Sequence, residues 1–145
     1  MILFSDSPEE TFAHGKKLGE NITGPRTVCF FGDLAAGKTT FIKGFVSGAA
    51  SISPDEVSSP TFVLLNIYEG EQSIYHFDLY RLQNAEGFFS LGFEEYWNAP
   101  GICCIEWAER IEEVLPKNAI YVRMKSLSEN KREILLEGID DLEKI

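Results

Sequence analysis

The sequence lacks the features that would place a chain in a membrane or outside the cell. It has no apolar run of about 18 residues, the shortest length that reads as a membrane span. Its N-terminus lacks the basic, then apolar, then small-residue order of a signal peptide. We therefore expect a cytoplasmic protein that makes no contact with membranes.

Positive charge is also scarce. The 145 residues include 13 lysines and arginines against 23 acidic residues, which gives a net charge of −10. A protein that holds a phosphate backbone by itself usually carries a basic patch, whereas the cations here are scattered along the chain. We expect no useful affinity for nucleic acid unless a partner protein holds the nucleic acid.

Cysteine is rare, and its odd count excludes a complete disulfide framework. Cys29, Cys103 and Cys104 all fall in predicted core strands. They could be redox-active or metal-binding, but small buried apolar residues are the usual interpretation of such positions. The content of 44 % hydrophobic and 25 % charged residues is ordinary for a globular protein, and the length suits one domain over residues 1–145.

The central motif is residues 32–39, which fit the P-loop pattern G-x-x-x-x-G-K-[ST]. Gly32 and Gly37 allow a tight turn whose backbone N–H groups cradle phosphate oxygens. Lys38 would reach the β- and γ-phosphates, and the Thr39 hydroxyl would bind Mg²⁺. The residues predicted to contact the nucleotide here are Gly32, Asp33, Leu34, Ala35, Ala36, Gly37, Lys38, Thr39 and Thr40.

The segments around the motif match the context that it requires, a buried strand before it and a helix after it. Residues 27–31 form a short apolar run that favours a strand. The helix would direct the positive end of its dipole at the phosphates. Its apolar residues recur with helical spacing at Phe41, Ile42, Phe45, Val46 and Ala49.

An earlier helix is predicted from residue 7 to about residue 22. Ser7 is its N-cap, Pro8 takes the first helical position, and Glu10 closes a capping box. Two roles stay open for this helix, packing on the sheet or touching a nucleotide base. The residues expected to face the core are Phe12, Leu18 and Ile22.

Residues 51–60 form a polar stretch that predicts a mobile loop. Thr61 follows it, and two interpretations stay open: a residue near the γ-phosphate that senses the nucleotide, or the first residue of a strand. Residues 62–68 and 73–79 predict an antiparallel hairpin.

Acidic residues close two predicted strands. Asp78 could hold Mg²⁺ through water, orient an attacking water, or pair with Arg81. His76 alternates in phase with Asp78, so we expect it on the same face in a structural role. Residues 102–106 form an apolar strand that ends at Glu106. This is the Walker B pattern, whose carboxylate holds the Mg²⁺ hydration shell or polarises water.

Several further elements complete the prediction. Residues 84–91 and 93–97 predict short helical turns broken at Gly92. Residues 107–115 predict an amphipathic helix that stops at a proline. The last expected elements are a hairpin over 118–124 and 132–138, and a frayed tail over 140–145.

Two observations favour ATP and hydrolysis over other P-loop chemistry. Guanine-specific proteins usually carry N-K-x-D after a core strand, and residues 130–133 are a near miss in a predicted turn. A small-molecule kinase would need an arginine-rich lid over the phosphates, and no such insertion is visible. We expect ATP to be the nucleotide and residues 130–133 to leave the base alone.

Four motifs together resemble the TsaE (YjeE) family, and they extend over nearly the whole chain, from about Glu9 to Gly138. One departure is Ala35, where the family often has glycine; a methyl group fits there unless the backbone needs a positive φ. The motifs are Gly-Asp-Leu-Ala-Ala-Gly-Lys-Thr-Thr at 32–40, Ser-Pro-Thr-Phe at 59–62, His-Phe-Asp-Leu-Tyr-Arg-Leu at 76–82 and Ile-Glu-Trp-Ala-Glu-Arg at 105–110.

The resemblance implies a small sheet between helices, ATP and Mg²⁺ as cofactors, and weak ATP hydrolysis by the chain alone. It also implies the TsaD and TsaB proteins as partners in making threonylcarbamoyladenosine in tRNA, which the chain would reach only through them. By residue match, Thr39 and Glu106 would serve the metal and Lys38 the phosphates. Asp78 would serve hydrolysis, and Trp107 would lie beside the nucleotide.

We therefore predict an α/β fold: a single-domain, P-loop NTPase-like mixed sheet flanked by helices, with strands 27–31 and 102–105 in its parallel centre. The predicted function is an ATP-binding, weakly ATP-hydrolysing accessory factor of tRNA modification. Two alternatives stay open, a nucleotide-gated binding module without meaningful turnover and a small-molecule kinase.

Overall fold

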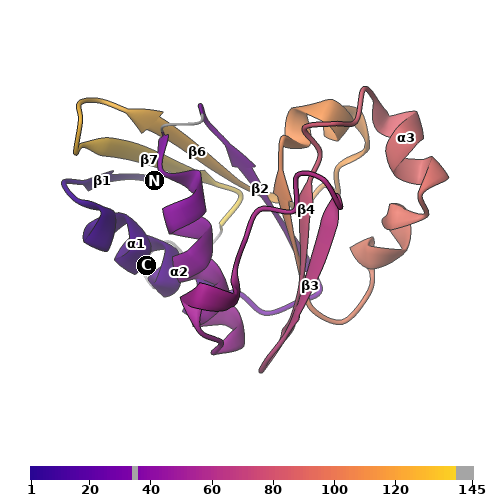
Figure 1. Cartoon of the computed structure of the whole chain (residues 1–145), viewed down its shortest axis with the longest axis horizontal. Helices are drawn as coiled ribbons and strands as arrows, with labels where there is room; N and C mark the ends of the chain where they lie inside the picture. Colours follow the sequence, from indigo (N-terminus) through magenta and orange to yellow (C-terminus); the bar gives the residue numbers. More distant parts are fainter. Residues whose placement is uncertain (34–35, 140–145) are drawn as a thin grey trace.

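The computed structural model describes residues 1–33 and 36–139 (Figure 1). Leu34, Ala35 and the predicted tail at 140–145 lie outside the described residues. The elements in chain order, with η for a short 3-10 helix, are β1 Ile2–Ser5, α1 Pro8–Glu20, β2 Arg26–Phe31, α2 Lys38–Ala50, η2 Pro54–Glu56, β3 Leu65–Glu69, β4 Ser73–Asp78, α3 Ala85–Ser90, η3 Phe93–Trp97, β5 Ile102–Glu106, η4 Ala108–Val114, β6 Ile120–Ser126 and β7 Arg132–Glu137.

The strands of the described chain form one mixed, seven-stranded sheet in the order β1-β7-β6-β2-β5-β4-β3. β2 lies in parallel between β5 and β6, and β4 continues the parallel set on the far side of β5. The outer pairs are antiparallel. The predicted mixed sheet with a parallel centre is confirmed, and so are both predicted hairpins.

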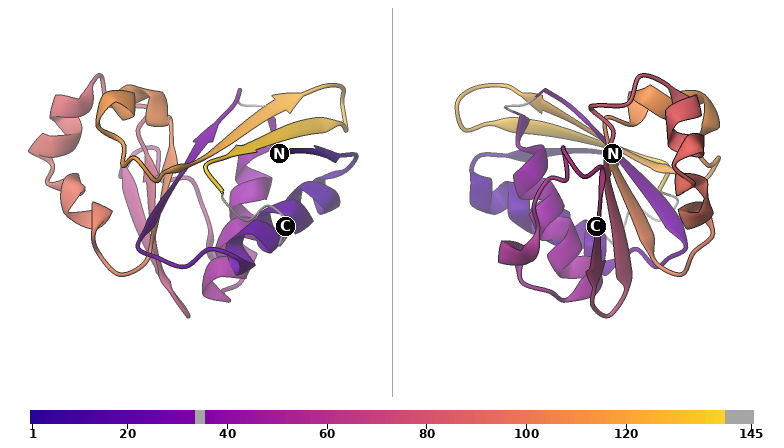
Figure 2. Two further views of the ribbon diagram at one scale, coloured as in Figure 1. Left: turned by 180° about the vertical axis from the view of Figure 1, so that it is seen from behind. Right: turned by 45° about the vertical axis from the view of Figure 1, so that its right-hand side comes forward.

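Helices cover both faces of this sheet (Figure 2). α1 and α2 lie on one face, and α3, η3 and η4 lie on the other. Because side chains alternate along a strand, each strand feeds two cores. In β5, Ile102 and Cys104 pack toward α2, whereas Cys103 and Ile105 pack toward α3.

Glycine lines the contact between α1 and α2. A Cβ atom at Gly15 would lie 2.2 Å from the Phe41 carbonyl oxygen, and one at Gly44 would lie 2.1 Å from the Phe12 carbonyl oxygen. Distances this short are impossible for real side chains, so the two backbones approach as closely as glycine permits. The contact fixes α1 against the helix that follows the P-loop motif.

The start of α1 differs in detail from the prediction. Ser7 caps the helix as expected, and its Oγ accepts a hydrogen bond from the Glu10 N–H at 3.1 Å. The Glu10 carboxylate accepts from the Asp6 N–H at 3.1 Å, so the capping-box prediction was wrong by one residue. Phe12 is only half-buried, because glycines rather than bulky side chains face α2.

The segment before β3 was predicted as strand but forms a turn. β3 begins at Leu65 instead of Phe62. Leu64 has φ 69°, and its N–H donates to the Pro60 carbonyl at 2.6 Å, which closes the turn. Thr61 belongs to this turn, so its interpretation as the first residue of a strand was wrong.

Two other elements depart from expectation. Residues 2–5, for which the sequence led to no prediction, form the edge strand β1 against β7. Residues 107–115 do not form one amphipathic helix. Trp107 has φ 60°, and η4 begins at Ala108 and is kinked at Ile111, where φ is −133°. No helix in the described ranges is both long and apolar enough to cross a membrane.

The cysteines behave as buried apolar residues. Cys29, Cys103 and Cys104 are free and buried. Burial raises the pKa of the Cys29 and Cys103 thiols to about 12, so both stay protonated at neutral pH. The Arg123 charge lowers the pKa of the Cys29 thiol, but burial raises it by more, so this thiolate is not activated.

Candidate functional site

The candidate site lies at the edge of the sheet where β2, β4 and β5 end, toward the top of Figure 1. The P-loop motif leaves β2 at this edge, and α2 begins there with Gly37 as its N-cap. Gly32 and Gly37 have φ of 148° and 90°, conformations that favour glycine, so both motif glycines stand where the backbone requires them.

A cavity of about 540 Å³ opens at this edge. It brings together residues from α2, the turn before β3, and the ends of β4 and β5. Those predicted from the sequence as site residues are Lys38, Thr39, Thr61, Asp78, Glu106 and Trp107, and the structure adds Ser59 and Tyr80.

Asp78 and Glu106 face each other in register across β4 and β5. The Asp78 carboxylate accepts hydrogen bonds from the Thr61 hydroxyl at 2.9 Å and from the Tyr80 N–H at 3.0 Å. The alternative of an ion pair with Arg81 was wrong, because the Arg81 guanidinium lies over the Phe62 ring, 5.2 Å from its centroid.

Glu106 is buried and bonded through one oxygen. Its Oε2 accepts from His76 Nε2 at 2.7 Å and from the Ser59 hydroxyl at 3.1 Å. The hydrogen bonds found for this carboxylate within the described residues all fall on Oε2, which leaves Oε1 for a ligand in the cavity. His76 shares the face of Asp78, as its strand position predicted.

Lys38 and Trp107 are in contact across the cavity. The Lys38 ammonium lies 4.9 Å from the centroid of the Trp107 ring, a cation–π distance. The left-handed backbone of Trp107 turns its side chain toward α2, and the Tyr80 ring supports it at 5.0 Å. The aromatic face holds the lysine beside the large cavity.

A second, smaller cavity of about 80 Å³ lies on the other side of the helix start. Gly37 and Thr40, both predicted as nucleotide contacts, line it together with residues that the sequence did not assign to the site. Residues 130–133, expected to lie apart from any base, return here through the β6–β7 turn. The lining residues are Ser7, Pro8, Thr11, Gly37, Thr40, Glu129, Asn130 and Arg132.

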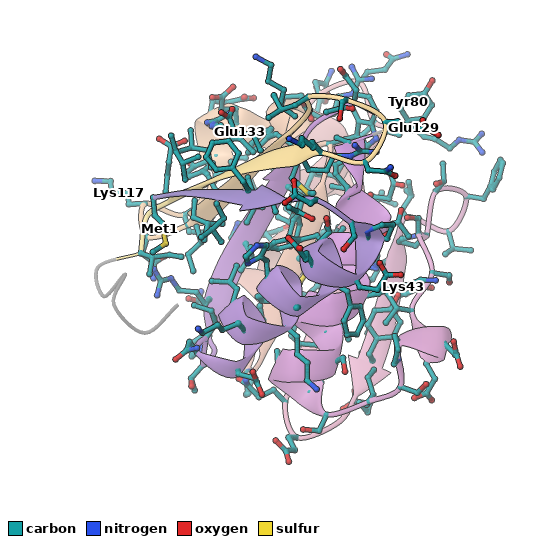
Figure 3. The ribbon with its side chains drawn as sticks, turned by 90° about the vertical axis from the view of Figure 1, so that its left-hand side faces the viewer. Met1, Lys43, Tyr80, Lys117, Glu129 and Glu133 are labelled. Atoms are coloured by element: carbon teal, nitrogen blue, oxygen red, sulfur yellow. The ribbon has the colours of Figure 1, made fainter. Side chains whose placement is uncertain are left out.

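In Figure 3, Tyr80, which lines the large cavity, and Glu129, which lines the small one, are labelled near each other toward the upper right. Two of the residues that line the small cavity, Ser7 and Glu129, are more than 110 residues apart in the chain. No local sequence pattern could have joined them. Gly32, Asp33 and Ala36 are not among the residues that line either cavity.

A family model for threonylcarbamoyl adenosine biosynthesis protein TsaE matches residues 5–134. The chain belongs to the TsaE family. Among curated TsaE proteins of tRNA threonylcarbamoyladenosine biosynthesis, that of Treponema pallidum is 38 % identical over 92 % of this chain and 98 % of its own length. The Bacillus subtilis protein is 37 % identical over 92 % of this chain and 82 % of its own.

A solved structure agrees with the assignment to TsaE. The crystal structure of YdiB from Bacillus subtilis superposes with a TM-score of 0.75 at 33 % identity, covering 92 % of this chain and 82 % of that one. The sequence signal that could have identified Ser59 as a site residue was the Ser-Pro-Thr-Phe motif of the TsaE resemblance. Tyr80 likewise falls within the third motif.

Proposed function

We propose that this TsaE chain binds ATP with Mg²⁺ and hydrolyses it weakly, as an accessory factor in the formation of threonylcarbamoyladenosine in tRNA. One observation carries the proposal. The first residues of α2, Lys38 and Thr39, share one cavity of about 540 Å³ with the carboxylates of Asp78 and Glu106. A helix N-terminus with lysine on one side and acids on the other suits a phosphate–metal complex.

Lys38 is the residue proposed to hold the phosphates. It is 6 % exposed, and its ammonium lies over the Trp107 ring; within residues 1–33 and 36–139 it forms no ion pair with a carboxylate. An anion entering the cavity would meet this cation together with the N–H groups of the first turn of α2. Trp107 is then the nearest aromatic reporter of that contact.

The donor set fits Mg²⁺. Thr39 and Glu106 offer hard oxygen ligands in one cavity. Within residues 1–33 and 36–139, no three His, Cys, Asp or Glu side chains converge to hold a metal alone. Mg²⁺ is commonly held by one or two protein oxygens plus substrate phosphates and water, so a sparse site is what this ion needs. When bound, the ion neutralises charge that develops on the phosphates.

Asp78 is the residue proposed to serve the hydrolytic step. Both of its oxygens already accept hydrogen bonds, from the Thr61 hydroxyl and the Tyr80 N–H. Those donors fix the direction of the carboxylate, which can then orient an attacking water. Thr61 is thereby tied to the chemistry and is the proposed sensor of the nucleotide.

We place the nucleoside end of the ligand toward the small cavity. Gly37 and Thr40 stand between the large cavity and the start of α1. A nucleotide whose phosphates lie at Lys38 would extend past them toward Thr11 and Asn130, so this proposal departs from the expectation that residues 130–133 leave the base alone. The two roles left open for α1 are therefore combined here: it packs on α2, and its first turn reaches the ligand.

TsaD and TsaB are the partners proposed for this chain, and tRNA is reached through them. A net charge of −10 repels a polyanion over a Debye length of about 8 Å at physiological salt. The shared family of this chain and the curated TsaE proteins ties it to threonylcarbamoyladenosine biosynthesis. The cytoplasm is the proposed location.

A nucleotide-gated binding module is the second candidate. The hydroxyls of Ser59 and Thr61, which precede β3, already donate hydrogen bonds to the carboxylates of Glu106 and Asp78, respectively. This arrangement favours a loop that changes partners when a nucleotide arrives, with or without turnover.

Phosphate release at saturating ATP separates the two candidates, measured with and without TsaD and TsaB and with Lys38→Ala as the negative control. Turnover that needs Lys38 supports the ATPase. Nucleotide-dependent capture of TsaB and TsaD without turnover supports the binding module. Transfer of phosphate to a metabolite instead of water indicates the kinase.

A mobility-shift titration of tRNA with this chain alone, at about 150 mM salt, tests the indirect role. We expect no shift. Micromolar binding by the isolated chain would contradict the proposed route through partners.

A further inference from the structure

A buried chain of hydrogen bonds leads from Glu106 away from the cavity. His76 Nε2 meets Glu106 Oε2 at 2.7 Å, and His76 Nδ1 meets the Tyr68 hydroxyl at 2.9 Å. The Tyr68 oxygen in turn contacts the backbone of Ser58: it lies 2.9 Å from the carbonyl oxygen and 3.2 Å from the N–H nitrogen. Glu106 is 4 % exposed and His76 only 1 %.

Hydrogen-bond capacity fixes part of this arrangement. An ionised carboxylate only accepts, so Nε2 of His76 carries the hydrogen toward Glu106. The Tyr68 hydroxyl has one hydrogen and two neighbours that can accept it, the Ser58 carbonyl and an unprotonated Nδ1 of His76. Burial raises the pKa of Tyr68, so the hydroxyl keeps its proton at neutral pH. When that hydrogen points to Nδ1, the imidazole is held at both nitrogens, and the Ser58 N–H donates to the same hydroxyl oxygen.

His76 also lies near both Thr39, a proposed metal ligand, and Ser59 of the loop before β3. Its ring borders a narrow gap behind the main cavity together with Thr39 and Ser59. Ser59 donates to the same Oε2 that His76 contacts, so two donors hold one oxygen of Glu106 from the protein side. The other oxygen, Oε1, is left to face a ligand.

We propose that His76 is a positioning residue for Glu106, and that the Tyr68 hydroxyl keeps the imidazole in the orientation that this requires. The inference rests on the proposed function, since it assigns Glu106 to a metal–nucleotide complex. Any buried carboxylate needs hydrogen-bond partners, but here both donors hold Oε2 and leave Oε1 toward the cavity, and a metal ligand is commonly oriented by an outer group of this kind. Through Ser58, the same hydroxyl ties that orientation to the loop that carries Ser59 and Thr61.

The test compares three variants with a matched control. His76→Ala removes the donor to Glu106, and His76→Gln restores an N–H near the position of Nε2. Tyr68→Phe removes only the hydroxyl that holds the ring. The control is Tyr75→Phe, which deletes a hydroxyl of similar burial on the opposite face of β4, bonded to the Pro100 carbonyl at 2.6 Å.

Two readouts are needed, because loss of activity alone would not separate positioning from folding. The first is the affinity for Mn²⁺ in the complex with a non-hydrolysable ATP analogue, followed by electron paramagnetic resonance. The second is the split between kcat and KM for ATP. We expect His76→Ala to weaken Mn²⁺ binding and lower kcat by about tenfold each, with KM for ATP changed by less than about twofold.

His76→Gln should recover most of the loss, and Tyr68→Phe should shift both readouts in the same direction by about threefold. Tyr75→Phe should match the wild type. The inference is overturned if His76→Ala lowers only the melting temperature, or if Tyr68→Phe and Tyr75→Phe behave alike while the wild type binds Mn²⁺ and nucleotide. Should His76→Ala not fold, the other variants decide. A wild type that binds neither probe overturns the proposed function itself, and this inference with it.

Discussion

The two faces of the sheet differ in the kind of packing that covers them. On the α2 face, two regular helices meet backbone to backbone through glycines, and the strand ends carry His76, Asp78 and Glu106. On the α3 face, short helical turns pack through aromatic rings. Phe88 lies there at the centre, with ring centroids 5.8 Å from Phe77 and 5.1 Å from Trp97.

This difference shows how one strand serves two purposes. Phe77 and Ile105 fill the aromatic side, and the next residues along the strands, Asp78 and Glu106, turn to the side where α2 begins. The glycine contact with α1 leaves α2 little freedom to tilt, so Lys38 is held in a fixed relation to the acids. The rigid pair of helices thus positions Lys38 and Thr39 against the strand ends, while the irregular aromatic side supports the sheet.

The largest expected effect separates two neighbours on β5 that face opposite sides. Glu106→Gln should lower kcat for ATP hydrolysis by about a hundredfold and leave nucleotide affinity nearly unchanged, because the charge acts mainly in the transition state. Ile105→Val should cost about 1 kcal/mol of stability and leave kcat per folded molecule as it was. Steady-state kinetics and thermal unfolding of both variants make the measurement. Equal effects on kcat would remove the distinction between the faces.

Asp78→Asn belongs to the same test. We expect it to behave as Glu106→Gln does if Asp78 serves hydrolysis. A variant that is destabilised but keeps its kcat would assign Asp78 to structure alone, through its bonds to Thr61 and Tyr80.

The next effect concerns nucleotide binding on the α2 face. ATP with Mg²⁺ at a hundredfold excess over Kd should stabilise the wild type by about 2.7 kcal/mol, since a ligand that binds only the native state shifts unfolding by mass action. Lys38→Ala should abolish the shift in melting temperature. Lys43→Ala, farther along the same helix (Figure 3), should keep it. An equal shift in all three proteins would contradict the P-loop assignment.

A pair of glycine substitutions compares the faces by packing alone. Gly44→Ala should destabilise the protein by about 3 kcal/mol, because its methyl group would meet the Phe12 carbonyl and force the helices apart. Gly87→Ala in α3 should be neutral or stabilising by up to about 1 kcal/mol. Its methyl group meets only the end of the Leu82 side chain at 3.4 Å, and alanine favours a helix. Chemical denaturation of both variants gives the two values.

The same contrast explains what the sequence could predict. Regular spacing identified α2 and the buried strands, and the P-loop and Walker B patterns were enough to locate Lys38 and Glu106. The glycine contact was not predicted, because it depends on two helices meeting at Gly15 and Gly44, and neither helix shows this by itself. On the other face, tertiary packing outweighed helical spacing, and η4 became two 3-10 segments with a kink at Ile111.

The same distinction between local sequence patterns and tertiary contacts applies to the site residues. Lys38, Asp78 and Glu106 belong to local patterns and were predicted individually. The bond from His76 to Glu106 crosses between strands that are 30 residues apart, so only the sheet register reveals it. The small cavity needs the β6–β7 turn to return to the start of α1, which no pattern within either segment encodes.

The smallest expected effect is optical, and it compares Trp107, which lines the large cavity, with Trp97, which does not. Trp107 lies under the Lys38 ammonium at 4.9 Å, whereas Trp97 stacks on Phe88 at 5.1 Å on the α3 face. When a phosphate draws Lys38 away, the electrostatic surroundings of the Trp107 ring change and those of Trp97 do not.

In a Trp97→Phe background, the fluorescence emission should therefore shift on addition of ATP with Mg²⁺, and in a Trp107→Phe background it should stay constant. Lys38→Ala in the first background should remove the change, because the cation that moves is gone. A nucleotide response carried by Trp97 instead would mean that the aromatic α3 face takes part in binding. It would contradict the view that this face only supports the sheet.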